Sequence, residues 1–281
     1  MAQGDYTRIN TNIGALNALN SLKAVQNRLG VAQLRLATGK QINSAADDPA
    51  GLTIATKFQF RASGLGQALN NIGDAKNMLA VAEGGLQKIN DILMIMRDKA
   101  VQAASDTLGT EERTAIQAQL DQFTAEIDNI VGSTKWNDAA LLNSSVGDIV
   151  LQTGADNDSN DQITLTGASF GSASSGDLGV DALTVSSAGG AQAAIDSLSS
   201  AIQSVSAKLQ YIGAAVSRLN FREETVTIAK VNTEAAYSRI MDADMANEQL
   251  NATKYQILQQ TATAMLAQAN AAPQSVLSLF R

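Results

Sequence analysis

Eight apolar residues in the C-terminal half of the chain follow one another in steps of three and four without a fault. They are Ile195, Leu198, Ile202, Val205, Leu209, Ile212, Val216 and Leu219. This spacing is the heptad pattern of an α-helix that packs along a seam. A helix with one apolar stripe must cover that stripe, so we expect further long helices beside it.

Two earlier stretches have the same helical period and supply the expected partners. One extends from Leu65 to Ala103, and the other from Ile116 to Ile130, so we expect two helices that fold back on each other. Thr110 is predicted to cap the second helix, with Glu111 and Glu112 in its first turn. The predicted seam of this helical rod is Leu79, Leu86, Ile89, Leu93, Ile116, Leu120, Phe123, Ile127, Ile202, Leu209 and Val216.

The middle of the chain has a different composition. Between Gly132 and Gly190 there are seven aspartates against one lysine, and nine of the 21 glycines. Within it, two short β-prone runs flank a polar turn and predict a β-hairpin near residues 146–167. We expect residues 168–190 to form a short acidic surface segment rich in Gly and Ser, which accounts for much of the net charge of −7.

The two ends of the chain carry amphipathic helical patterns with little else to pack against. One interpretation is that they pair within one chain as a coiled coil. The other is that they stay largely unfolded in the monomer and become ordered when many copies associate. The nearly neutral charge of the segments flanking the acidic middle favours association, because a large net charge would oppose close packing of identical copies.

The composition also excludes several classes of function. The chain has no histidine and no cysteine, which removes disulfides, imidazole or thiolate zinc sites and the common nucleophile systems of hydrolases. The acidic balance argues against a nucleic-acid binder. Asp156–Asp161 resembles the start of a calcium loop, but the sixth position is Asp161 instead of glycine, so we interpret it as a hairpin turn. We therefore predict no enzymatic activity, no metal and no cofactor.

Three stretches of the sequence resemble bacterial flagellin, the subunit of the flagellar filament. They are the opening Ile9–Asn12 with Ala15–Ala18, the central Thr38–Leu52, and the ending Gln268–Arg281. The similarity covers about residues 9–142 and 183–281. It implies a mainly α fold in which long antiparallel helices form a coiled-coil rod with a small β-hairpin. It also implies a structural protein that polymerises for swimming motility, in a short form without large outer domains.

The resemblance divides the chain into an inner domain, residues 1–40 and 240–281, and a rod domain, residues 41–239. The terminal helices of the inner domain would line the filament channel and make the subunit contacts. The expected assembly residues are Ile9, Ile13, Leu16, Leu22, Val25, Leu29, Met245, Leu250, Ile257, Leu258, Met265, Leu266, Val276, Leu277, Leu279 and Phe280.

The resemblance also implies partners and a location. The main partner is the chain itself, as a helical homopolymer, joined by an export chaperone, a filament cap and hook–filament junction proteins. The first thirty residues lack the apolar centre of a secretory signal. Export in an unfolded state through the flagellar type III system, to the extracellular flagellum, fits that observation.

A vertebrate Toll-like receptor that senses flagellins is a further partner implied by the resemblance. Flagellins that it recognises carry an Arg, a Leu four residues later, and a Glu on the following helix. The matching positions here are Ile95, Lys99 and Gln119, and only the nearby Arg97 keeps a positive charge. We therefore expect weak recognition.

Two alternatives remain at this point. A hook–filament junction protein would share the terminal helices, although such proteins match the central and C-terminal motifs less fully. A coiled-coil scaffold of another kind would have no need for these terminal motifs.

Overall fold

The computed structural model describes the backbone of residues 11–278 and the side chains of residues 11–271. The helices are α1 (Ile13–Thr38), α2 (Pro49–Ala103), α3 (Thr110–Ser133), α4 (Gly167–Phe170), α5 (Ala188–Met241) and α6 (Met245–Ser278). Two antiparallel strand pairs are β1 (Lys135–Trp136) with β2 (Ala139–Ala140), and β3 (Ile149–Gln152) with β4 (Gln162–Leu165). A short 3-10 helix, η1 (Ser159–Asp161), precedes β4. The expected mainly α fold with a small hairpin is confirmed.

The chain divides into two compact units. The first comprises Met1–Phe60 and Thr233–Arg281, and the second comprises Arg61–Asn232. The two divisions fall within α2 and within α5, and each of these helices continues across its division without a break.

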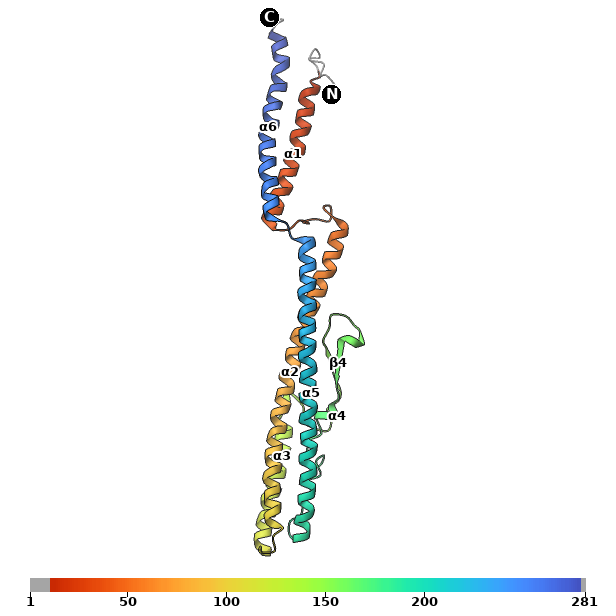
Figure 1. Cartoon of the computed structure of the whole chain (residues 1–281), viewed down its shortest axis with the longest axis vertical. Helices are drawn as coiled ribbons and strands as arrows, with labels where there is room; N and C mark the ends of the chain where they lie inside the picture. The colour runs from red at the N-terminus through yellow and green to blue at the C-terminus, as the bar shows by residue number, and fades with distance from the viewer. Residues whose placement is uncertain (1–10, 279–281) are drawn as a thin grey trace. The chain divides into compact units, whose positions relative to one another are not determined.

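In the second unit, α2 and α5 pack antiparallel. Lys76 Nζ on α2 lies 2.8 Å from Glu223 Oε2 on α5, and Arg97 Nε on α2 donates to Ser199 Oγ at 3.3 Å. As residue numbers rise along α2, those of the partners fall along α5. Helix α3 turns back after α2, and its buried residues Ile116, Leu120 and Ile127 belong to the same hydrophobic cluster as those of α2 (Figure 1). The expected fold-back of these helices is therefore present.

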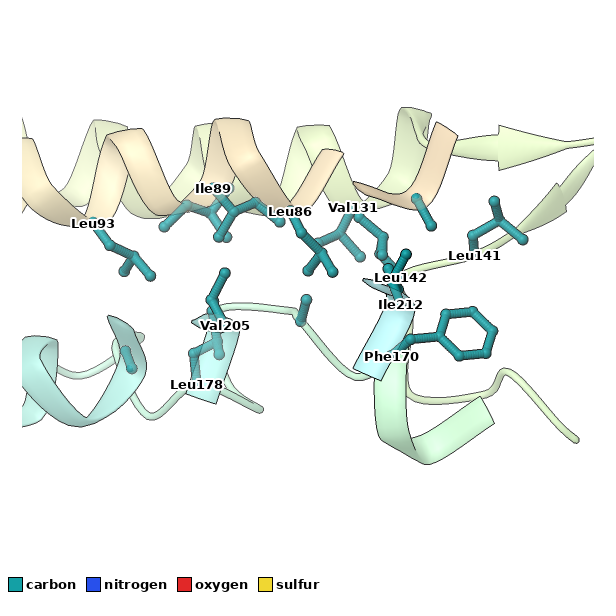
Figure 2. Packing of buried hydrophobic residues seen from close by; sticks show 14 of the residues in the cluster. Leu86, Ile89, Leu93, Val131, Leu141, Leu142, Phe170, Leu178, Val205 and Ile212 are labelled. Atoms are coloured by element: carbon teal, nitrogen blue, oxygen red, sulfur yellow. The ribbon is translucent and has the colours of Figure 1, made fainter. Parts of the chain in front are cut away.

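One hydrophobic cluster joins these helices into a single core. Figure 2 shows Leu86, Ile89 and Leu93 of α2 facing Val205 of α5. Of the eleven predicted seam residues, seven are buried: Leu79, Leu86, Ile89, Leu93, Ile116, Leu120 and Ile127. The other four are half-buried and pack against the same cluster: Phe123, Ile202, Leu209 and Val216.

The buried face of α5 includes two of its own alanines, which the heptad pattern of large apolar residues did not predict to be buried. Ala201 and Ala215 are buried, whereas Ile202 and Val216, the next residue in each case, are only half-buried. Alanine has no side chain beyond Cβ, so it lets helices approach closely. The larger residues then cover the edges of the seam.

The start of α3 differs from the prediction that Thr110 caps it. The N-cap residue is Gly109, with φ −78° and ψ 176°, and no side chain makes a capping hydrogen bond there. Thr110 instead begins the helix, and its carbonyl accepts from the Thr114 hydroxyl. The acidic first turn, with Glu111 and Glu112, is present as expected.

The predicted hairpin is formed by β3 and β4, and Arg222 of α5 forms hydrogen bonds with the turn between the two strands. The strands pair from Ile149 with Leu165 to Gln152 with Gln162. Arg222 donates to Asp161 Oδ1 at 2.7 Å and to the Asn160 carbonyl at 2.6 Å. The carboxylates of two aspartates in this turn therefore make hydrogen bonds within the protein: Asp161 binds Arg222, and Asp158 Oδ1 caps η1 by accepting from the Asn160 amide.

Residues 168–190 are more than the acidic surface segment we expected. Asp177 and Asp181 are exposed, but five apolar side chains enter the core. These are Phe170, Ala173, Leu178, Val180 and Val185. Figure 2 shows Phe170 and Leu178 among the labelled residues of α2, α3 and α5. The helices alone leave part of the seam open, and this segment covers it.

Polar contacts from α3 and α5 hold the same segment in place. Asp128 on α3 accepts from the Ser175 amide at 2.9 Å and from its hydroxyl at 2.8 Å. Lys208 Nζ on α5 donates to the Gly171 carbonyl at 2.6 Å. Burial lowers the pKa of Lys208, and the charge of Asp177 opposes that shift.

Gly167, at the start of α4, gives a test of this packing. A Cβ at this position would overlap the carbonyl oxygens of Val146 and Gly147, which are backbone atoms and cannot turn aside. We expect Gly167→Ala to lower the free energy of unfolding by about 1–3 kcal/mol. Gly176→Ala, where a Cβ meets nothing within 4 Å, should stay within about 0.5 kcal/mol. Urea unfolding of the monomer measures both, and equal stability of the two variants would contradict this packing.

In the first unit, α1 and α6 also pack antiparallel. Asn12 Nδ2, just before α1, donates to the Ala269 carbonyl at 2.8 Å, and Arg35 Nη1 lies 3.1 Å from Glu248 Oε1. Figure 1 shows the two helices side by side. Of the two interpretations of the chain ends, the described residues therefore show pairing within one chain.

Two short connectors lie at one end of the α1 and α6 pair. Gly39 ends α1 with φ +69°, a left-handed conformation that suits glycine, and Pro49 begins α2. The backbone beyond Gly39 pairs with the link between α5 and α6: the Gln41 amide donates to the Met241 carbonyl at 2.7 Å, and the Ala243 amide donates to the Gly39 carbonyl at 2.9 Å. Both helix interruptions are thus joined by backbone hydrogen bonds.

Candidate assembly surface

The seam between α1 and α6 buries very little apolar surface. Its buried core is Leu29 and Ala32 of α1 with Ala252 of α6, and Leu36 and Tyr255 pack around it. Most of the described apolar side chains on these two helices remain exposed in the single chain.

The predicted assembly residues fall into four groups. Two are buried, Leu22 and Leu29, and two are half-buried, Val25 and Leu266. Seven are exposed: Ile13, Leu16, Met245, Leu250, Ile257, Leu258 and Met265. The remainder are not described in full: Ile9, Leu279 and Phe280 lie outside the described residues, and for Val276 and Leu277 only the helical backbone is described.

Three further residues of α1 are apolar and exposed, although they were not among the predicted assembly residues. Leu19, Val31 and Leu34 are 38%, 43% and 49% exposed. Val31 and Leu34 are three residues apart, a spacing that places both on one face of a helix. The spacing of Val31 and Leu34 could have predicted this second apolar face of α1. The predicted assembly residues of α1 belong only to the apolar stripe that contains Leu22 and Leu29.

The three residues at the receptor-matching positions, and Arg97 close to them in sequence, lie on α2 and α3 in the second unit. Ile95 is 45% exposed, Arg97 and Gln119 are exposed, and Lys99 is half-buried. Arg97 is also held by its hydrogen bond to Ser199 of α5. Ile95, Arg97 and Gln119 therefore lie on the surface of the single chain.

The connector beside α1 contains a carboxylate with a shifted pKa. Asp47 Oδ2 accepts from the Ser44 amide at 2.8 Å, the Asn43 amide at 3.0 Å and the Ser44 hydroxyl at 3.1 Å. These donors, the Ser44 amide foremost, hold the pKa of Asp47 below its ordinary value of 3.8. The ionised carboxylate therefore organises the turn that leads into α2.

This pKa shift predicts how the turn responds to acid. A carboxylate with a depressed pKa stabilises the fold above its ordinary pKa of 3.8, and the stabilisation is lost as pH falls through the depressed value. At pH 6 we expect Asp47→Asn to reduce the hydrogen-exchange protection of the Ser44 amide relative to the unchanged protein, and we expect that difference to shrink at strongly acidic pH. Equal protection in the two proteins at pH 6 would show that the charge does not hold the turn.

The described part of the chain offers little that suggests a catalytic or metal site. Within it, no three acidic side chains gather as metal ligands. None of its helices combines the length and apolar character needed to cross a membrane.

Two family models match most of the chain. The model for the bacterial flagellin N-terminal helical region matches residues 9–146, and the model for the bacterial flagellin C-terminal helical region matches residues 195–280. The residues between these matches contain the β3–β4 hairpin and the segment that covers the core.

Known proteins of similar length are related over almost the whole chain. A flagellin of Halalkalibacterium halodurans is 36% identical over 273 residues, covering 97% of this chain and 99% of the relative. The flagellar filament 33 kDa core protein of Treponema phagedenis is 35% identical over 286 residues, with the same coverage. The solved structure of a putative flagellar hook-associated protein from Vibrio parahaemolyticus aligns with a TM-score of 0.55 at 15% identity, covering 70% of this chain and 100% of that one. This last likeness concerns the fold alone.

Proposed function

Because the chain belongs to the bacterial flagellin family and is a subunit of the extracellular flagellar filament, we propose that the exposed apolar faces of α1 and α6 are its assembly surface. Flagellins polymerise with copies of themselves, and the protein is structural and not an enzyme. The proposal concerns which residues make the contacts.

One observation supports this assembly surface. Ten large apolar side chains on α1 and α6 are at least 38% exposed, although the seam between these helices is small. They are Ile13, Leu16, Leu19, Val31, Leu34, Met245, Leu250, Ile257, Leu258 and Met265. Such a concentration of exposed apolar residues marks an interaction site in a protein that leaves the cell. Association of many copies would bury them and would stabilise the helices at the same time.

The proposed assembly surface also suggests how the chain divides into two domains. We assign residues 1–40 and 240–281 to an inner domain that lines the filament channel, and residues 41–239 to a rod. The helix interruptions at Gly39–Asp48 and Asp242–Asp244 support this assignment, because they separate α1 and α6 from the longer helices.

Family membership also suggests the partners that the chain meets during export and filament assembly. They are an export chaperone, a distal filament cap and hook–filament junction proteins, with export in an unfolded state through the flagellar type III apparatus. For the Toll-like receptor we propose weak recognition, because Ile95, Lys99 and Gln119 depart from the recognised pattern. A reporter-cell assay with purified monomer tests this, and potency equal to that of a motif-bearing flagellin would refute it.

The experiment that tests assembly is electron microscopy of purified monomer seeded with short filament fragments. We expect long filaments above a critical monomer concentration, with the amount of polymer set by the concentration in excess of it. A monomer that remains soluble at all concentrations, with or without seeds, would overturn the proposed assembly function.

A further inference from the structure

A groove of about 320 Å³ lies between α1 and α6 in the first unit. Two guanidinium groups, those of Arg28 and Arg35, line it together with one carboxylate, that of Glu248. Arg35 Nη1 pairs with Glu248 at 3.1 Å. Arg35 Nε, in contrast, is buried and has no hydrogen-bond partner within the described residues. Buried donors in native proteins are nearly always satisfied, so the groove lacks an acceptor.

Arg28 adds a second cation without a counter-charge. Its side chain is exposed and makes no hydrogen bond or ion pair with any other described residue. Asn27, Asn251 and Tyr255 contribute further polar groups to the walls. The groove therefore presents two guanidinium groups and only one internal carboxylate to balance them.

The charge of the two helices shows what would fit this groove. With Lys23, Arg28, Arg35 and Lys254 against Glu248 alone, α1 and α6 together carry +3. The whole chain is at −7, so the remaining residues carry −10. Because α1 and α6 together are positively charged, they attract carboxylates from other parts of a neighbouring copy.

We propose that the groove between α1 and α6 binds a carboxylate side chain of a second copy of this chain. Guanidinium groups bind carboxylates through paired, charge-assisted hydrogen bonds, and the exposed guanidinium of Arg28 supplies the donors, beside the unpartnered Nε of Arg35. This inference rests on the proposed assembly function, because it requires copies packed closely around α1 and α6. It adds a polar contact that sets the register of an otherwise apolar surface.

Arg28→Gln in the full chain tests the proposal, because Arg28 makes no hydrogen bond or ion pair with any other described residue, and its replacement therefore leaves the polar contacts of the described monomer intact. We expect its critical concentration for seeded growth to rise at least about tenfold at low ionic strength. Arg28→Glu should raise it further, because the reversed charge repels the incoming carboxylate. Lys23→Gln is the matched control: it removes another exposed cation of α1 that lies outside the groove, and it should change the critical concentration less than about twofold.

The outcomes separate this inference from the assembly proposal itself. If the unchanged protein forms no filaments, the assembly function fails whatever the variants do. If the unchanged protein grows but Arg28→Gln matches it, the groove binds no carboxylate. Equal losses in Arg28→Gln and Lys23→Gln, or no difference between Arg28→Gln and Arg28→Glu, would likewise overturn the inference, because the effect would then not depend on charge within the groove.

Discussion

Replacing Ile257 by aspartate is expected to raise the critical concentration for filament growth more than about a hundredfold. Ile257 is 58% exposed on α6, so the isolated chain tolerates a charge there. In the filament the same side chain would lie between subunits, where an uncompensated buried charge costs about 3–5 kcal/mol. Each 1.4 kcal/mol corresponds to a factor of ten in the equilibrium constant. Sedimentation of seeded reactions over a range of monomer concentrations measures the effect.

The neighbouring Gln256 provides the control for this variant. It is exposed on the same turn of α6, and Gln256→Asp introduces the same charge next to the apolar face instead of within it. We expect Gln256→Asp to polymerise far better than Ile257→Asp, and both monomers to unfold at nearly the same urea concentration. Normal growth of Ile257→Asp would show that this face of α6 does not make subunit contacts.

The helices of the second unit could be predicted from sequence because their pattern is local and repeated. A three-and-four spacing maintained over many turns fixes both the helix and the face that it buries. The pattern was less informative about which edge of α5 lies deepest. Ala201 and Ala215 are buried and Ile202 is not, because close helix packing selects small residues that a search for large apolar side chains overlooks.

The burial of residues 168–190 could not be predicted in the same way. Phe170, Leu178 and Val185 are irregularly spaced among Gly, Ser and Asp, so no period marks them as core. Their positions depend on partners far away in sequence, such as Gln117 of α3, whose Oε1 accepts from the Val185 amide at 2.8 Å. Nothing in the sequence around Gln117 indicates that this polar residue of α3 binds the backbone of a distant segment.

For the terminal helices, the sequence could not predict what covers their apolar faces. Their amphipathic pattern indicates that an apolar face becomes covered, but a pattern cannot distinguish cover within one chain from cover by another copy. The structure divides the two cases: Leu22 and Leu29 are buried within one chain, whereas Leu250 and Ile257 are not. The groove beside Arg28 depends on an unsatisfied atom of Arg35, which only atomic positions can reveal.

Phe170→Ala is expected to lower the free energy of unfolding of the monomer by about 3–5 kcal/mol. Phe170 is fully buried, and its ring stacks on Tyr211 of α5 with centroids 6.4 Å apart and an angle of 9° between the planes. The Tyr211 hydroxyl accepts from the Thr166 amide at 2.9 Å, so the ring pair also fixes the end of the hairpin to α5. Removing the ring leaves a cavity that this anchored segment can close only in part.

Phe221→Ala is the matched control, because it makes the same chemical change on α5 at a side chain that is 71% exposed. We expect its free energy of unfolding to stay within about 0.5 kcal/mol of the unchanged protein in urea titrations of the monomer. If residues 168–190 were only a surface segment, Phe170→Ala would behave like Phe221→Ala. A large difference between the two variants would instead establish that the segment between the two family-matched regions is part of the core that holds α2, α3 and α5 together.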